Sequence, residues 1–182
     1  MAYHHGDLRR TLLDAAAESI AEAGVAKLSL RALAKRVGVS NAAPTHHFGD
    51  KTGLLTALAT EGFELLAESL TAPGAGKDLV DMGVAYVGFA LAHPSHFAVM
   101  FEPSLHRCGD PGLAEAGAQA RAALATGVAD ALHGSGGDGD DQETQLAAWS
   151  LVHGYATLVL SGAIEVADPI SLARSIASHL TV

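Results

Sequence analysis

Apolar residues recur every three or four positions along most of this 182-residue chain, which is the spacing of one face of an α-helix. No segment alternates apolar and polar residues with the two-residue period of a half-buried strand. Glycine and proline interrupt the helical pattern and divide it into separate stretches. The pattern therefore predicts an all-α protein of about nine helices.

Residues that start or stop helices set the expected boundaries. Gly24 and Gly38 favour a stop, and the Asp-Pro pair that ends at Pro169 is typical of a helix start. Glycine-rich stretches at 72–76 and 133–141 favour loops. The predicted helices cover residues 7–23, 29–37, 41–47, 50–71, 77–92, 94–101, 113–132, 142–164 and 169–181.

The densest set of signals lies between residues 29 and 51. Ser29 can cap a helix with an apolar stripe on one side, and Gly38 can end that helix in a left-handed conformation. Ser40 is a candidate cap for the next, short helix, and Asp50 for the long helix after it. A helix, a turn and a short helix with small or hydrogen-bonding side chains make a helix-turn-helix, whose second helix enters the DNA major groove.

Two groups of residues resemble a known family. The stretch YHHGDLRRTLLDAA at 3–16, followed by VS…HHF.DK…LL at 39–55, resembles the N-terminal domain of TetR-type transcriptional regulators. Further on, the Trp149, His153 and Gly154 pattern in AAWSLVHGYATLVLSG resembles a C-terminal class of these regulators, the WHG type, which binds ligand and dimerises. The resemblance implies a ligand-responsive repressor that binds a palindromic operator as a dimer and is released by a small-molecule effector.

The helix-turn-helix and the resemblance together indicate which side chains meet DNA. The family usually has an aromatic residue, often Tyr, at the position of Thr45, and threonine reaches a phosphate less far. We expect base contacts from Asn41, Ala42, Thr45 and His46, and phosphate contacts from Ser29, Arg31, His47 and Lys51, with Ser40 beside them.

The distribution of charge fits a DNA-binding head on an acidic body. The chain carries a net charge of −9, which by itself would repel a polyanion. Residues 1–51, however, hold seven basic and five acidic residues, whereas the remainder holds four basic and fifteen acidic ones. We therefore expect residues 1–49 to form the DNA-binding domain and residues 50–182 a helical bundle for ligand binding and dimerisation, with the homodimer held by helices 142–164 and 169–181.

Composition and hydropathy are typical of a cytoplasmic globular protein. Hydrophobic residues make up 49% of the chain, Cys108 is its single cysteine, and its start lacks the apolar run of a signal peptide. Residues 144–164 carry no formal charge. Polar side chains are spread through that stretch, so we predict a buried interface helix and no membrane span.

The middle of the chain holds the candidate ligand-binding residues, although phenylalanine and methionine at helical spacing are most often simple core residues. His93, His96, His106 and Cys108 suggest a metal site, but Pro94 breaks the helix that would align the first two, so no metal or cofactor is expected. The candidate ligand-binding residues are Phe89, His93, Phe97, Met100, Phe101, Trp149, His153 and Tyr155.

Two other classes of function stay open on the sequence. An enzyme would need a catalytic constellation, and the chain has no GxSxG, P-loop, HExxH or CxxC motif, so no catalytic residue is assigned. A helical small-molecule-binding protein without DNA contact fits the acidic composition and the short Thr45. Salt-dependent binding to operator DNA would separate the regulator from both.

Overall fold

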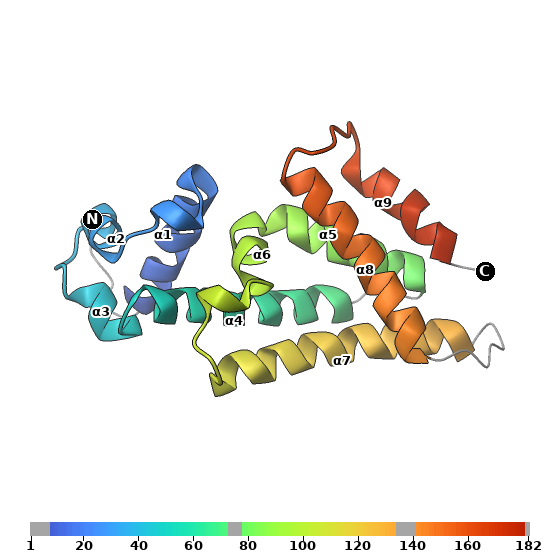
Figure 1. Ribbon diagram of the computed structural model, residues 1–182, viewed down its shortest axis with the longest axis horizontal. Coiled ribbons are helices and arrows are strands. Elements are labelled where there is room, and N and C mark those ends of the chain that lie inside the picture. Colours follow the sequence, from blue (N-terminus) through green and yellow to red (C-terminus); the bar gives the residue numbers. More distant parts are fainter. Residues whose placement is uncertain (1–7, 73–77, 134–140, 181–182) are drawn as a thin grey trace. The chain divides into compact units, whose positions relative to one another are not determined.

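The computed structural model describes residues 8–72, 78–133 and 141–180, and these ranges hold nine α-helices and no strand (Figure 1). The predicted all-α fold of about nine helices is confirmed, while most of the two predicted loops at 72–76 and 133–141 lies outside the described residues. The helices are α1 Leu8–Ala23, α2 Leu30–Val37, α3 Ala43–Phe48, α4 Lys51–Thr71, α5 Leu79–Ala92, α6 Pro94–Met100, α7 Pro111–His133, α8 Asp141–Leu160 and α9 Pro169–Ala177.

The helices belong to two compact units. The first comprises Met1–Gly62 with Pro94–Ala114, and the second comprises Phe63–His93 with Glu115–Val182. Two short 3-10 helices, η1 (Val25–Lys27) and η2 (Pro103–Leu105), belong to the first unit, and η3 (Ser178–Leu180) belongs to the second. The predicted boundary between residues 49 and 50 separates a DNA-binding region from a ligand-binding region. It does not coincide with the limits of the two packing units, and the functional division stays a prediction.

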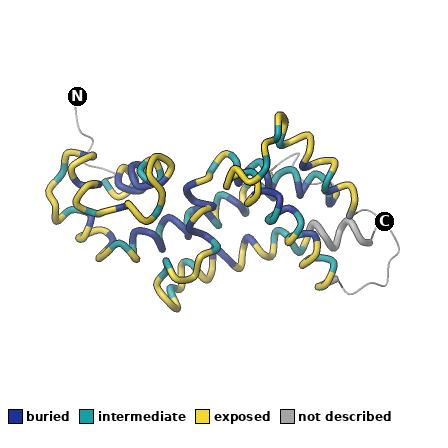
Figure 2. The backbone as a smooth tube through the Cα atoms, turned by 45° about the horizontal axis from the view of Figure 1, so that its top comes forward, coloured by how far each residue is buried: buried dark blue, intermediate teal, exposed yellow. Residues whose placement is uncertain are grey.

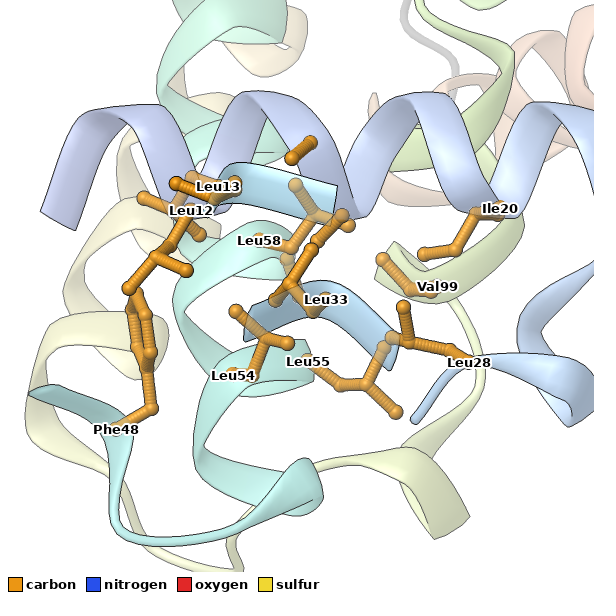
Figure 3. Packing of buried hydrophobic residues seen from close by; sticks show 14 residues of the cluster. Leu12, Leu13, Ile20, Leu28, Leu33, Phe48, Leu54, Leu55, Leu58 and Val99 are labelled. Atoms are coloured by element: carbon orange, nitrogen blue, oxygen red, sulfur yellow. The ribbon is translucent and has the colours of Figure 1, made fainter. Parts of the chain in front are cut away.

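The first unit is held by large aliphatic side chains from α1, α2 and α4, joined by Val99 of α6 (Figure 3). Leu12, Leu33, Leu54 and Leu58 are each at most 1% exposed. Burying one such side chain contributes roughly 1.5–3 kcal/mol. The helix-turn-helix therefore rests on a scaffold that α4 and α6 complete.

Local signals set the ends of α2 and the start of α4. Ser29 is the N-cap of α2, and its hydroxyl accepts from the Ala32 N–H. Gly38 ends the helix in the left-handed conformation at φ 77°, which glycine adopts without steric cost. Asp50 accepts the Gly53 N–H at 2.7 Å and so caps α4. All three predicted roles are confirmed.

The start of α3 differs from the prediction. The helix begins at Ala43 and not at residue 41, and its N-cap is Ala42 without a side-chain hydrogen bond, so Ser40 is not the cap. Pro44 explains the shift, because a proline is tolerated in the first turn, where the missing N–H has no helical partner. The Ser40 carbonyl accepts the Ala43 N–H at 3.0 Å and closes the longer turn.

The helices predicted at 142–164 and 169–181 are shorter in the structure. Helix α8 ends at Leu160, and the Gly162 φ of 71° takes the chain out of helical geometry. Helix α9 ends at Ala177 and is followed by the 3-10 turn η3. No helix in the described ranges is long and apolar enough to cross a membrane.

Small residues let the helices of the second unit approach one another. A Cβ atom on Gly83 of α5 would come within 3.1 Å of both Ala177 of α9 and Val152 of α8. Ala90 and Ala156 are fully buried. Figure 2 colours the backbone by burial, and buried stretches run along the described helices. Helices α5, α8 and α9 thus form a close-packed group, and Gly83 permits its spacing.

Candidate nucleic-acid interface and ligand cavity

The outer face of α2 is positively charged. Leu33, Ala34 and Val37 are buried, so the helix turns Arg31 and Lys35 outward. The segment from residue 24 to residue 49 contains no Asp or Glu, and neither Arg31 nor Lys35 has an ion-pair partner among the described residues. This face can attract a polyanion although the chain as a whole is acidic.

Three of the predicted DNA-binding residues come together beside this face. Ser29, Arg31 and Asn41 line a shallow hollow of about 490 Å³ together with Ala32 and Lys35. Lys35 is not among the predicted contacts, although its spacing of four residues from Arg31 places it on the same helical face. Two cations and two hydrogen-bonding side chains suit a phosphate group.

Helix α3 turns its middle residues outward. Pro44 and Phe48 are buried, whereas Thr45, His46 and His47 are exposed. The predicted residues before the helix, Ser40, Asn41 and Ala42, are also exposed. The structure therefore leaves every predicted α3 side chain accessible, and it places Thr45 where a side chain leaves the helix toward solvent.

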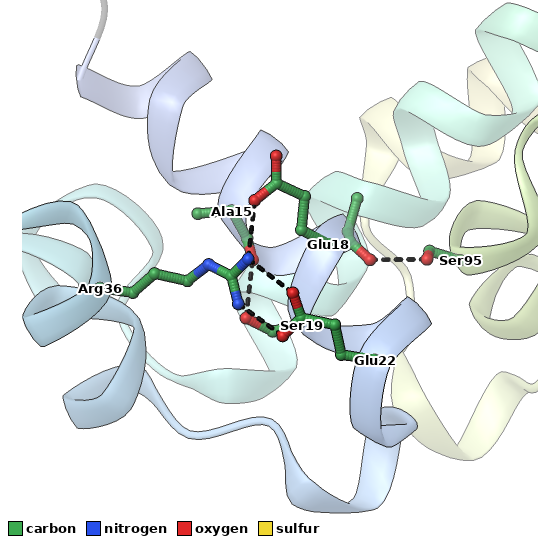
Figure 4. A network of polar contacts seen from close by, with 7 residues as sticks. Ala15, Glu18, Ser19, Glu22, Arg36 and Ser95 are labelled. Carbon is green, nitrogen blue, oxygen red and sulfur yellow. Dashed lines mark hydrogen bonds and ion pairs between the residues drawn. The ribbon is translucent and has the colours of Figure 1, made fainter.

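Arg36 is basic in sequence but is neutralised in the structure (Figure 4). Its guanidinium forms ion pairs with Glu18 at 2.9 Å and Glu22 at 2.7 Å, both on α1. The hydrogen bonds and charge of these carboxylates raise the pKa of Arg36, and Arg36 lowers the pKa of Glu22. The charge of Arg36 is thus compensated by carboxylates, unlike the charges of Arg31 and Lys35 on the outer face of α2.

Lys51 is committed to the protein backbone. Its ammonium donates to the Val25 carbonyl at 2.9 Å and the Ala26 carbonyl at 3.3 Å, which ties the start of α4 to η1. A lysine has three N–H donors, so one donor can still serve a phosphate. The predicted phosphate contact of Lys51 stays a prediction. In the structure Lys51 also holds η1, the turn that precedes α2.

The eight candidate ligand-binding residues divide between the two units. Buried Phe97 and Met100 are part of the first unit with Phe101, and Met100 packs so close to Gly62 that a Cβ there would lie 2.6 Å from its sulfur. The other five, Phe89, His93, Trp149, His153 and Tyr155, belong to the second unit.

The second unit encloses a small apolar cavity between α5, α7 and α8. Its volume is about 30 Å³, whereas pockets for drug-sized ligands measure roughly 300–1,000 Å³. Trp149 is the one predicted ligand residue that lines it. The lining residues are Leu79, Met82, Gly83, Tyr86, Leu124, Gln145, Ala148, Trp149 and Val152. A larger ligand could enter only if these helices moved apart.

A chain of hydrogen bonds runs along one wall of the cavity. The Trp149 indole N–H donates to the Tyr86 hydroxyl at 3.2 Å, and that hydroxyl lies 2.8 Å from His153 Nδ1. The Trp149 indole is a donor only, so the Tyr86 hydroxyl accepts from it. The same hydroxyl donates to Nδ1 when His153 carries its proton on Nε2, and it accepts from Nδ1 in the other tautomer. Burial raises the pKa of Tyr86 and lowers the pKa of His153, so both groups are kept neutral.

Tyr155 contacts the backbone of the second unit. Its side chain is 5% exposed, and its hydroxyl donates to the Pro169 carbonyl at 2.9 Å. This bond joins α8 to the start of α9, and Tyr155 does not line the cavity. Among the described residues, no three His, Cys, Asp or Glu side chains are grouped as a metal ion would require.

The comparisons with known proteins identify the family. Residues 12–58 match the model described as bacterial regulatory proteins of the tetR family, and residues 79–182 match the one described as a tetracyclin repressor-like C-terminal domain. The chain therefore belongs to the TetR family of bacterial transcriptional regulators.

Individual relatives agree with this assignment. The HTH-type transcriptional repressor Rv1474c of Mycobacterium tuberculosis is 33% identical over 132 residues, which are 71% of this chain and 66% of that repressor. Matched segments cover 25–66% of the curated relatives' own lengths. A Rhodococcus sp. RHA1 structure described as of unknown function is 34% identical, with a TM-score of 0.83 and coverage of 99% of this chain and 96% of that one. The structure of the regulatory protein SCO4313 is 27% identical, with a TM-score of 0.78, and the match covers 95% of this chain and 94% of that one.

Proposed function

We propose that this protein is a ligand-responsive transcriptional repressor that binds a palindromic operator as a homodimer. The observation that carries the proposal is the surface of α2 and α3, where exposed cations and hydrogen-bonding side chains stand on a helix-turn-helix with no acidic residue between positions 24 and 49. Repression is supported by the M. tuberculosis relative, which is described as a repressor. A regulator of this kind acts on chromosomal DNA in the cytoplasm and needs no catalytic residue or cofactor.

The contacts divide by chemistry. In this proposal Asn41, Ala42, Thr45 and His46 meet base edges, because short and hydrogen-bonding side chains can approach them closely. Ser29, Arg31, Ser40, His47 and Lys51 hold phosphates, and Lys35 joins them because it shares the hollow with Arg31.

The proposed dimer uses α8 and α9. These helices carry exposed aliphatic side chains, including Leu158 at 47%, Ile170 at 39% and Leu172 at 38%. Exposed apolar groups of this kind favour association with a second apolar surface. A two-fold dimer would also present two recognition helices to half-sites roughly 34 Å apart, one turn of DNA.

The effector is proposed to bind in the second unit at the cavity beside Trp149, Tyr86 and His153. A ligand with a hydrogen-bonding group could replace part of this chain while its apolar part enters the widened cavity. Such binding would favour one spacing of the dimer over another and release the operator.

Selection of random duplex DNA on the purified protein tests the proposal. We expect an inverted repeat with two protomers per duplex. Leu158→Glu places a charge in the proposed dimer surface and should yield weak, single half-site binding, whereas Glu64→Gln on the exposed side of α4 should leave binding unchanged. If the selection enriches no sequence, DNA recognition is excluded, and a binding protein or an enzyme becomes the better description.

A further inference from the structure

An arginine from outside the helix-turn-helix is seated on its second helix. Arg107 follows η2 in the stretch between α6 and α7, 59 positions after Phe48 in the sequence. Its guanidinium Nη2 donates to the Phe48 carbonyl at 3.1 Å and pairs with Asp50 at 3.2 Å. Its backbone N–H donates to the Thr56 hydroxyl at 2.9 Å. One residue thus contacts the end of α3 and the first turns of α4.

Two glycines form the seat for this guanidinium. A Cβ atom on Gly49 would lie 2.7 Å from Arg107 Nη2, and one on Gly53 would lie 2.8 Å from it. Gly49 also has a φ of 80°, which L side chains rarely adopt. The guanidinium therefore occupies space that exists only because both positions lack a side chain.

The Phe48 carbonyl lies at the end of α3 and needs a hydrogen-bond donor from outside the helix. The last four carbonyls of a helix have no partner within the helix. In α3, which has six residues, these carbonyls make up most of the helix, so its own hydrogen bonds hold it weakly. Arg107 supplies one of the missing donors, and Asp50 holds the guanidinium in place from the start of α4.

We propose that Arg107 is a positioning residue for DNA recognition, which fixes the end of α3 and the turn into α4 without itself touching DNA. This inference rests on the proposed function, in which α3 reads the operator. Arg107 lies in the part of the chain that matches the C-terminal family model, at residues 79–182. A shift of the segment between α6 and α7 that withdrew the guanidinium would loosen α3 and weaken operator binding.

Two simpler roles make different predictions. A mere surface ion pair would contribute little, because the Arg107 and Asp50 side chains are 46% and 64% exposed. If Arg107 formed only such an ion pair, loss of the pair would change neither the hydrogen exchange of backbone N–H groups in α3 nor the affinity for the operator. A direct phosphate contact would weaken binding and also flatten the salt dependence by about one unit.

The test compares Arg107→Gln with Arg107→Lys and the control Arg121→Gln, which removes an exposed arginine of α7 in the second unit. Operator affinity is measured at several salt concentrations, and hydrogen exchange is measured over residues 43–53. For Arg107→Gln we expect operator binding about three- to tenfold weaker, because a hydrogen bond from a charged donor is lost at a partly exposed site. The salt slope should stay as in the wild type, while exchange in residues 43–53 becomes faster.

The two other variants sharpen the result. Arg107→Lys keeps the charge but not the planar fork, so an intermediate effect is expected, and Arg121→Gln should match the wild type. Unchanged exchange in Arg107→Gln, or a salt slope flatter by one unit, would overturn the proposal. If the wild type bound no DNA, the proposed function would fail, while the exchange data would still decide whether Arg107 holds α3.

Discussion

The two units differ in where their polar side chains of interest lie. In one they are exposed outside the core, and in the other they are at least partly buried. In the first unit, large leucines fill the interior, and the side chains proposed to meet DNA stand outside on α2 and α3. In the second unit, glycine and alanine let helices come close, and a hydrogen-bonded chain runs from buried Tyr86 to half-buried Trp149 and His153. The first arrangement suits a rigid surface that binds a large polyanion. The second suits a site where a small molecule competes for internal hydrogen bonds.

The largest effect is expected from the leucine core of the first unit. Leu58 is fully buried, so Leu58→Ala should lower the free energy of unfolding by about 2–5 kcal/mol through lost burial and the cavity left behind. Urea unfolding measures the change. Glu64→Ala, exposed on the same helix, should stay within about 0.5 kcal/mol of the wild type. A loss below about 1 kcal/mol in Leu58→Ala would contradict the described packing.

In the second unit, removal of the Tyr86 hydroxyl should lower the free energy of unfolding. Tyr86→Phe keeps the buried ring but removes the hydrogen bonds to Trp149 and His153, and we expect a loss of about 1–3 kcal/mol in urea unfolding. Tyr155→Phe removes a single bond to the Pro169 carbonyl and should cost less, about 1 kcal/mol. The internal chain would have no energetic importance if Tyr86→Phe were as stable as the wild type.

The outer surface should respond through DNA binding and not through stability. Arg31→Ala should weaken binding to all duplexes alike and flatten the slope of log affinity against log salt by about one unit. Arg36→Ala is the control, since Glu18 and Glu22 already neutralise that arginine. Equal slope changes in the two variants would show that the ion pairs do not separate these cations. His46→Ala should instead change the preference among operator variants.

The smallest effect is expected in the pH dependence of the second unit. Burial lowers the pKa of His153 in the folded state, so the unfolded chain binds the proton more readily. The stabilising contribution is complete above the unfolded pKa of about 6.5 and declines as the pH falls below it. His153→Gln keeps an acceptor for Tyr86 but cannot titrate there. Urea unfolding from pH 7.5 to 5 should show a shallower decline for this variant, and an identical decline would remove His153 from the explanation.

Much of the first unit could be predicted because its signals are local. The caps at Ser29, Gly38 and Asp50 each act within a few residues, so the sequence carries them directly. The start of α3 was mispredicted where two local signals competed, and the position of Pro44 outweighed the capping tendency of Ser40. The seat of Arg107 was not predictable, because its partner Phe48 is far away in the sequence.

The second unit was harder to predict because its chemistry depends on tertiary contacts. The partners of Tyr86 lie 63 and 67 positions away, and Asp81 is the other polar side chain in α5. One signal was present, since a buried tyrosine needs a partner for its hydroxyl, and Trp149 and His153 are one helical turn apart. The sequence did not indicate that Phe97 and Met100 belong to the first unit while nearby Phe89 and His93 belong to the second.

The proposed function depends on the binding of operator DNA by the surface of α2 and α3. To test this binding, the affinity of the wild type is measured for the selected duplex and for a scrambled duplex of equal length over a range of salt concentrations. We expect both affinities to fall linearly with log salt, at roughly 0.9 units per phosphate contacted, with the selected duplex bound more tightly throughout. Affinity that is independent of salt, or equal for both duplexes, would contradict the assignment of this surface to operator recognition.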